Sequence, residues 1–568
     1  MKAGHRLLRG LSVLGLALWL AALLAVGTTI LLFFAGLMIP KVTVRTILEG
    51  WSTTAVVLAI VVVGGCAVRR GVGRLFDRFA VGGYVWATLF AVSLIVLFYV
   101  VERYRGHRAW EKLEAEGGGQ PVVLRGMEPF GVADAENFAA LPLIDEWWEE
   151  SSSGSSEAAL RRLVKPVPHP GGGDWEIQQP VDLGVCLEHY LPSARTAGDT
   201  GSLSAEQFLE AWEVFAAELE QLSVAAERPY ARFELPYDRG LFDQTLPRKL
   251  DLFRAMSTAF RLRAVAALAD GASGRSLADI ERLGRISDLV GQEPMLEHQR
   301  LTLLLASIQP IWEGISRQRW SEAQLAALQA QLSRPELLRE HRQAVRMELL
   351  LLIDLSEKLF PVRSRVPPVD LTEEWPSQML IAGGRFIYPT GWLLQNQVGW
   401  YRLSREIAEY AVAADQRRAY VEVTRQIERD WVYRPPSLDP FFATFLMPRG
   451  GATAVEVTRR YAYAQSALDL AATGCVIERY RLARRQVPER LEQLVPDWIA
   501  RVPVDLIDGR PLRYRRLDGN RYVLYSVGWN QIDDGGAVVE RPAGSRSRDG
   551  FAQDQRKGDW VWAVTPVN

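Results

Sequence analysis

Few residues in this chain have the type and spacing that catalysis or metal binding requires. Cys186 stands three positions before His189, and a thiol beside an imidazole is the pairing of a nucleophile with its general base. That spacing alone fixes no geometry, so we interpret both as structural residues. None of the six histidines pairs with another at metal-ligand spacing, and we expect His298 and His341 to lie on polar, solvated helix faces.

The signatures of common enzyme classes are absent from the sequence. It contains no HExxH, no Gly-x-Ser-x-Gly, no GxxxxGK(S/T) and no CxxC. The three cysteines, Cys66, Cys186 and Cys475, are too few for a disulfide framework, and both a bond between the last two and burial as free thiols stay open. We therefore assign no catalytic residue and no cofactor-binding residue. Enzymatic activity is uncertain, and the sequence favours a protein that is not an enzyme.

Composition narrows the classes of partner. The chain has 568 residues, a length that predicts three or four domains, and its formal net charge is −1. Because Lys and Arg nearly balance Asp and Glu, no basic surface is expected, and we predict no nucleic-acid partner. The 18 tryptophans are scattered, which indicates core packing rather than a binding stripe.

Long uncharged runs occur within the first 101 residues and not later in the chain. They cover residues 10–40, 50–68 and 79–101. Each approaches or exceeds the roughly 20 apolar residues that a helix needs to cross a bilayer. Residues 1–105 are therefore predicted to be a membrane anchor with three transmembrane helices. A cleaved signal peptide is the alternative for the first run, and a buried or re-entrant helix is the alternative for the second.

The positive charges orient this predicted anchor. Lysine and arginine are concentrated before residue 10 and between residues 69 and 78, whereas the loop between the first two runs holds only Lys41 and Arg45. Positively charged loops stay in the cytoplasm. The prediction is an inner (cytoplasmic) membrane location, with the lipid bilayer as one partner. The N-terminus is then cytoplasmic, and the large C-terminal part is periplasmic or extracytoplasmic.

The next segment, residues 106–182, is predicted to be a linker because Gly, Pro and Ser dominate its composition. Two apolar stretches in it, residues 137–142 and Trp147-Trp148, are expected to pack on this protein's own domain. Residues 183–450 are predicted to be a helical domain, since apolar side chains recur there at three- to four-residue spacing.

Three sites in that domain have the Ser-x-x-Gln or Ser-x-x-Asp pattern of a helix start. Ser204 with Gln207 and Ser321 with Gln324 predict capping boxes, in which serine and glutamine satisfy each other's backbone N–H groups. Ser276, with Asp279 three positions later, is expected to begin a third helix.

Residues 451–568 show a different order of elements. A long helix is predicted from Ala454 to about Arg485, and a short helix follows within residues 487–496. Asp518-Gly519 signals a hairpin turn before a strand at 521–527, and a last strand is expected at 560–564. The predicted fold class is mainly α, with N-terminal transmembrane helices, a large helical exported domain and a small C-terminal α+β pseudopilin-like domain.

This order resembles the C-terminal half of the major pseudopilin of type II secretion, where a long helix, a segment like Val487-Pro488, a proline–aspartate turn, a small sheet and an acidic calcium loop follow one another. The resemblance covers roughly residues 454–564. The exported part also resembles an uncharacterised family of large membrane-anchored proteins of planctomycetes and verrucomicrobia, which share a segment like residues 136–140, a helical middle and this tail. That family implies no activity. Filament assembly is not implied, because the long helix lies deep in the chain and carries several arginines.

The pseudopilin resemblance implies a calcium ion in the acidic loop. Calcium takes about six to eight oxygen ligands, and Asn530, Asp533, Asp534 and Asp559 could supply them together with backbone carbonyls. In the pseudopilin pattern an aspartate stands near Asn530, so one charge is missing here. The alternative is a solvated acidic turn, closed by Gly535-Gly536. Calcium is the only cofactor that the sequence suggests.

These patterns predict a membrane-anchored envelope protein of unknown specific role, acting as a non-enzymatic scaffold or partner-binding protein with an envelope protein as its partner. An accessory subunit of a secretion or transport system is one alternative, and an envelope hydrolase is another. A polar seam in the spans would favour the accessory subunit. A deep pocket with two convergent carboxylates, or a buried His–Asp pair, would favour the hydrolase.

Overall fold

The computed structural model describes residues 80–116, 131–153, 159–167, 171–194, 203–235, 246–359, 390–413, 415–430, 447–541 and 553–565. The chain divides into two compact units, Met1–Val101 and Glu102–Asn568. The predicted boundary at residue 105 lies close to this division. The structure makes no further division at residues 182 or 450.

The predicted membrane anchor is not supported by the described residues. None of their helices is both long and apolar enough to cross a membrane. This finding contradicts the predicted transmembrane helices, the fold class that included them and the inner-membrane location. The fold class is corrected to mainly helical, with a small C-terminal region of strands. The uncharged runs 10–40 and 50–68 lie outside the described residues.

The third run falls on α3 (Ala80–Ala115). Side chains of this helix are described from Ser93 onward, and those up to Val101 are mostly apolar and exposed. From Glu102 the same helix carries charged side chains and belongs to the second unit.

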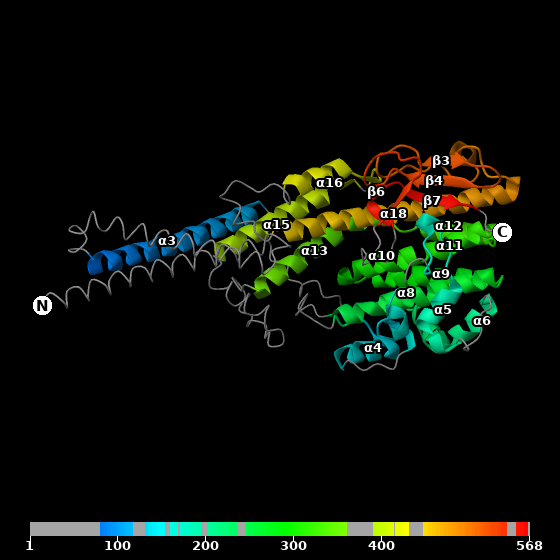
Figure 1. Cartoon of the computed structure of the whole chain (residues 1–568), viewed down its shortest axis with the longest axis horizontal. Coiled ribbons are helices and arrows are strands. Elements are labelled where there is room, and N and C mark those ends of the chain that lie inside the picture. Colours follow the sequence, from blue (N-terminus) through cyan, green and yellow to red (C-terminus); the bar gives the residue numbers. More distant parts are fainter. Residues whose placement is uncertain are drawn as a thin grey trace, which may run out of the picture. The chain divides into compact units, whose positions relative to one another are not determined.

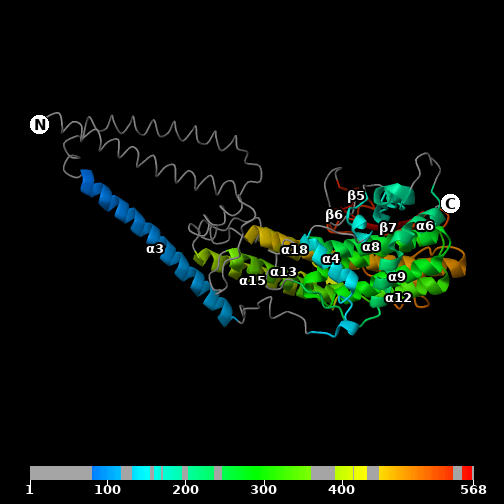
Figure 2. The same ribbon diagram turned by 90° about the horizontal axis from the view of Figure 1, so that it is seen from below.

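Helices of the second unit stack in layers, which Figures 1 and 2 show from two sides. Each helix buries an apolar stripe against the next layer, because apolar residues recur at the helical period along it. The outermost layer, coming first in the chain, contains α4 (Pro142–Ser153), α5 (Leu183–Tyr190), α6 (Ala205–Trp212) and α7 (Ala216–Ala225). The middle layers contain α8 (Leu246–Ala269), α9 (Ser273–Val290), α10 (Glu297–Ala306), α11 (Ile308–Ser316) and α12 (Glu322–Ser333).

The far side of these layers is built around one long helix. This is α18 (Met447–Arg484), beside which lie α13 (Leu337–Leu359), α15 (Thr390–Tyr410) and α16 (Val421–Glu428). Figure 1 shows α18 with the strands on one side and α11 and α12 on the other. One hydrophobic core therefore runs from the helical layers through α18 into the sheet.

In the part of the chain that the structure describes, seven strands form three small antiparallel sheets. The main sheet has the order β3 (Arg513–Arg516), β4 (Tyr522–Ser526), β7 (Trp560–Val564), with Arg513 opposite Tyr525 and Tyr522 opposite Val564. The predicted strands at 521–527 and 560–564 correspond to β4 and β7. Two hairpins were not predicted: β1 (Val412–Ala413) with β2 (Arg418–Ala419), and β5 (Val538–Glu540) with β6 (Gln553–Gly558).

Much of the predicted linker is part of the fold. The described residues between 131 and 177 contain α4 and the short 3-10 helices η2 (Asp134–Glu136), η3 (Ala159–Val164) and η4 (Trp175–Ile177). Phe138, Trp147 and Leu160 have no exposed surface. The two apolar stretches do pack on this protein's own domain, as predicted. The buried side chains explain why the Gly, Pro and Ser around them do not make this segment a free tether.

Both predicted capping boxes are confirmed. Gln207 N donates to Ser204 Oγ at 3.1 Å, and Ser204 N donates back to Gln207 Oε1 at 2.9 Å. Ser321 and Gln324 form the same pair of bonds at the start of α12. The third prediction was wrong, because α9 begins at Ser273. Its residue Asp279 faces the protein interior and accepts two hydrogen bonds from Arg263 of α8, at 2.8 and 2.7 Å.

Candidate functional site

The structure does not bring Cys186 and His189 together as a catalytic pair. The Cys186 thiol is buried and donates to the carbonyl of Gly171 at 3.6 Å. His189 Nε2 lies 3.3 Å from the carbonyl of Lys165. Burial raises the pKa of Cys186 to about 12, so the thiolate that a nucleophile needs is not formed near neutral pH. Cys186 and Cys475 are both buried free thiols, which decides the question of their pairing.

The histidine predictions were half right. His298 is partly exposed, and its Nε2 lies 3.3 Å from Glu348. His341, however, is almost fully buried between α13 and α18, where its Nε2 lies 2.9 Å from the hydroxyl of Thr458. Its face of α13 is covered by α18, a tertiary contact that the helical period of α13 alone does not show.

Three carboxylates that are buried or half-buried among the described helices are engaged with neighbouring groups. Glu297 accepts a 2.6 Å hydrogen bond from the hydroxyl of Tyr461. Asp469 accepts two hydrogen bonds from Arg417, at 2.8 and 2.9 Å. Glu478 receives two bonds of 2.7 Å from Arg481. These pairs tie elements together or satisfy one helix, as buried charges generally require.

The four predicted calcium ligands lie at one end of the main sheet. Asn530, Asp533 and Asp534 belong to the loop between β4 and β5, and Asp559 joins β6 to β7. Asp559 is fully buried, and both of its oxygens accept backbone N–H groups, from Asp534 at 3.3 Å and from Gly536 at 2.7 Å. Asn530 Nδ2 donates to Asp534 Oδ2 at 2.8 Å. The loop is thus closed by protein groups.

This arrangement does not fit a calcium ion. Within the described part of the chain, no three acidic, histidine or cysteine side chains are grouped so that they could hold a metal ion. Both oxygens of Asp559 point at amide hydrogens, and the amide of Asn530 presents a donor to Asp534 where a metal ligand must present an oxygen. The structure brings the four residues into one loop region without converging them on a common point.

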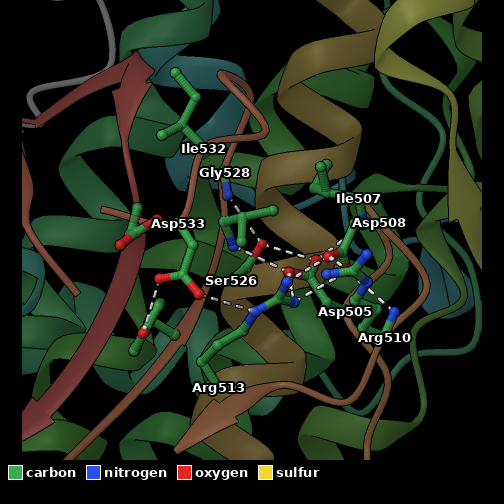
Figure 3. A network of polar contacts seen from close by, with 12 residues as sticks. Asp505, Ile507, Asp508, Arg510, Arg513, Ser526, Gly528, Ile532 and Asp533 are labelled. Atoms are coloured by element: carbon green, nitrogen blue, oxygen red, sulfur yellow. Dashed lines mark hydrogen bonds and ion pairs between the residues drawn. The ribbon is translucent and has the colours of Figure 1, made fainter. Parts of the chain in front are cut away.

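A guanidinium lies where the acidic loop meets the neighbouring turn (Figure 3). Arg513 donates through Nη1 to Asp505 Oδ2 at 3.2 Å and to Asp508 Oδ1 at 3.0 Å, and through Nη2 to Asp508 Oδ2. Its Nε lies 3.7 Å from Asp533 Oδ2. One cation thus contacts three carboxylates. Arg513 was not predicted to be a site residue, although Asp505, Asp508 and Arg513 are close in the chain.

Asp505 is the most completely bonded of these carboxylates. Its Oδ1 accepts from Ile507 N at 2.9 Å and from the hydroxyl of Ser526 at 2.8 Å, and its Oδ2 accepts from Val527 N at 3.0 Å as well as from Arg513. Burial raises the pKa of Asp505, and these hydrogen bonds oppose the rise. The side chain therefore serves as a structural anchor between the turn and β4.

The pKa values of the remaining carboxyl groups are shifted in different directions. Burial raises the pKa of Asp559 to about 6, helped by the charges of Asp534 and Asp533 and opposed by the two backbone amides. Burial also acts to raise the pKa of Asp508, but hydrogen bonds from Arg513 and from the amide of Arg510 outweigh it, and the pKa is lowered. The hydrogen bond to Asp508 raises the pKa of Arg513.

A hollow of about 670 Å³ lies beside the β3–β4 hairpin. Its lining has alternating charge, with Arg516, Leu517, Asp518 and Arg521 from the hairpin and Glu489 from the segment before η10 (Leu491–Leu494). Arg516 lies 4.0 Å from Glu489, and Arg521 lies 4.0 Å from Asp518. Both carboxylates are largely exposed. The Asp518-Gly519 turn signal located the hairpin, but sequence alone did not bring Glu489 to it.

A second hollow of about 230 Å³ lies at the start of α13. Arginines and acidic residues share its lining. Arg339 forms an ion pair with Glu336 at 2.5 Å, and Arg417 forms one with Asp469 at 2.8 Å. Gln465, also in the lining, accepts from the backbone N–H of Leu337 at 2.9 Å. Gln465 therefore helps to hold α13 against α18.

Comparisons with family models, with curated proteins and with solved structures find no match for this chain.

Proposed function

We propose that this protein is a non-enzymatic scaffold that binds a protein partner at the hollow beside the β3–β4 hairpin. The observation that carries the proposal is the charge pattern of this hollow. Two carboxylates and two guanidiniums line it as two ion pairs, each with a nitrogen–oxygen distance of 4.0 Å. We call these four side chains, Glu489, Arg516, Asp518 and Arg521, the hairpin charge set.

The hairpin charge set contributes little to folding. Exposed ion pairs of this kind are worth about 0–1 kcal/mol, because solvent screens them and holding two long side chains costs entropy. Asp518 is fully exposed and Glu489 is 77% exposed, so neither is held by packing. Side chains that the fold does not need can exchange their present partners for those of another protein. A mixed-charge surface of this kind gives a binding site its specificity.

The way in which the β3–β4 hairpin is packed on the rest of the protein suits a scaffold. β3 and β4 belong to the same sheet as β7, and β7 is packed on α18 and η4. Gly474 of α18 allows this approach, because a Cβ there would lie 2.6 Å from the indole of Trp562. The ring of Trp562 also contacts Trp175, with centroids 5.6 Å apart. The hairpin is therefore held on a rigid frame, which limits the entropy lost on binding.

Charge reversal tests the proposal. The full-length chain carrying Glu489→Lys and Asp518→Lys would be compared with wild type by cross-linking in cells, affinity capture and mass spectrometry. The matched control is Glu409→Lys with Glu422→Lys, which reverses two exposed carboxylates that also sit beside arginines but lie on α15 and α16. We expect wild type and control to recover the same defined set of proteins, and the hairpin variant to lose it while its melting temperature is unchanged.

Two outcomes would overturn the proposal. One is recovery of the same partner set by the hairpin variant. The other is recovery by wild type of nothing but the chain itself, which would point instead to a self-contained ligand-binding protein or enzyme.

A further inference from the structure

The acidic loop and the turn before β3 are joined through a closed ring of polar contacts. At one side of the ring, Gly528 N donates to the hydroxyl of Ser526 at 3.2 Å, and that hydroxyl donates to Asp505. Gly528 is where the loop begins. At the other side, Asp533 lies against Arg513, which donates to the same Asp505. Figure 3 shows both routes converging on this one carboxylate.

A cation is required where these two segments meet. Asp505, Asp508 and Asp533 place three carboxylates around one guanidinium, and without a cation these like charges would repel one another. The side chain of Asp505 has no exposed surface, so solvent cannot screen its charge. Arg513 supplies a positive charge that contacts all three carboxylates, and its own side chain is only 15% exposed; Arg510 lies 3.9 Å from Asp508.

The geometry suits a guanidinium better than a calcium ion. A guanidinium is planar and offers N–H donors in a fixed fork, and Arg513 uses that fork on both oxygens of Asp508. Calcium needs about six to eight oxygens directed at one point. Here, both oxygens of Asp505 already receive two donors each, and Asp533 Oδ1 accepts from the hydroxyl of Tyr525 at 3.0 Å and from Gly535 N at 3.1 Å.

We propose that Arg513 is the resident cation of this end of the sheet, and that it holds the acidic loop closed in place of the calcium ion that the pseudopilin resemblance implies. Because Arg513 is covalently part of β3, closure of the loop does not depend on the concentration of any divalent ion. This inference is independent of the hairpin charge set, whose side chains do not take part in the ring.

The first test uses the unaltered full-length protein. Its melting temperature and the hydrogen exchange of the loop amides would be measured in ~10 mM calcium and in excess chelator, a range that covers weak extracellular calcium modules. We expect no difference in either measurement. A higher melting temperature, or slower exchange at Gly535 and Gly536 in calcium, would overturn the proposal.

The second test removes the guanidinium. Arg513→Gln is expected to speed exchange at the Gly535 amide by up to about fivefold, the upper end for an ion pair with a half-exposed carboxylate 3.7 Å away. Arg513→Lys keeps the charge but loses the fork, so it is expected to give an intermediate rate. Arg516→Gln is the matched control on the same strand and is expected to leave Gly535 unchanged.

A double-mutant cycle with Asp533→Asn keeps the test informative if Arg513→Gln lowers global stability. The two changes should then be non-additive in the exchange of Gly535, because both remove the same contact. Additive effects, or an exchange rate that Arg513→Gln leaves unchanged, would show that Arg513 does not hold the loop.

Discussion

Trp312 on α11 donates its indole N–H to the backbone carbonyl of Ala563 on β7, across 2.8 Å and 251 positions of sequence. This bond joins the helical layers to the outer strand of the main sheet. Both groups are buried, so each would be left without a partner in the absence of the other. The sheet of this protein is therefore docked through a specific polar contact as well as through apolar packing.

Trp312→Phe should loosen that docking. The variant leaves the Ala563 carbonyl buried and unbonded and also creates a small cavity, at a cost of about 2–3 kcal/mol. Hydrogen exchange of the β4 and β7 amides should accelerate. Trp212→Phe is the control, because Trp212 makes an equivalent bond to the Ala259 carbonyl, at 3.3 Å, inside the helical layers. That variant should leave β7 protected, and equal loss of β7 protection in both would contradict the assignment.

Tyr461→Phe should lower the free energy of unfolding, because it removes the hydrogen bond that the buried carboxylate of Glu297 accepts. Burial raises the pKa of Glu297, and the hydrogen bond from Tyr461 opposes this rise. Removing the hydroxyl should therefore lower the unfolding free energy by ~1–3 kcal/mol near neutral pH. In a Glu297→Gln background, where no charge needs compensation, the same change should cost less. Equal costs in the two backgrounds would show that the hydroxyl does not act through Glu297.

Two glycines in helices should respond to alanine in opposite directions. A Cβ on Gly314 of α11 would collide with the indole of Trp320, so Gly314→Ala should destabilise by about 1–3 kcal/mol. A Cβ on Gly274 of α9 meets nothing within 4 Å, so Gly274→Ala should stabilise by about 0.4–1 kcal/mol. Chemical denaturation would measure both. A neutral Gly314→Ala would mean that α11 and Trp320 are packed less closely than the structure shows.

The buried imidazole of His341 should make stability depend on pH. Burial lowers the pKa of His341 to about 3, with a contribution from the charge of Arg342. In the unfolded chain the same group has a pKa of about 6.5, so it takes up a proton on unfolding as the pH falls below that value. Its contribution to stability is present above about pH 6.5 and is lost progressively as the pH falls towards 3.

His341→Gln should remove this component of the pH profile. Between about pH 7 and pH 4, wild type should lose ~3 kcal/mol more of unfolding free energy than the variant does. Denaturation at several pH values would measure the difference between the two curves, in which the other titrating groups cancel. Parallel curves would mean that His341 accepts its proton in the folded protein.

Local signals in the sequence located many of the elements. The capping boxes at Ser204 and Ser321, the turn at Asp518-Gly519 and the strands β4 and β7 of the main sheet were all predicted correctly, because each depends on residues a few positions apart. The membrane anchor was the largest prediction that the described residues contradict. The hairpins β1–β2 and β5–β6 were missed, because β1, β2 and β5 have only 2, 2 and 3 residues and show no clear alternation.

The sequence by itself determined where α6 and α12 begin, where the chain turns before β4 and which residue types could bind calcium. Only the tertiary structure decided what those residues do. His341 is buried because α18 covers its face of α13, and Asp533 of the acidic loop lies against Arg513 because strand pairing places β3 beside β4. The physical reason is the sequence separation of the interacting residues. Capping and turn formation involve residues a few positions apart, whereas burial and charge pairing involve elements that are distant in the sequence and that the fold brings together.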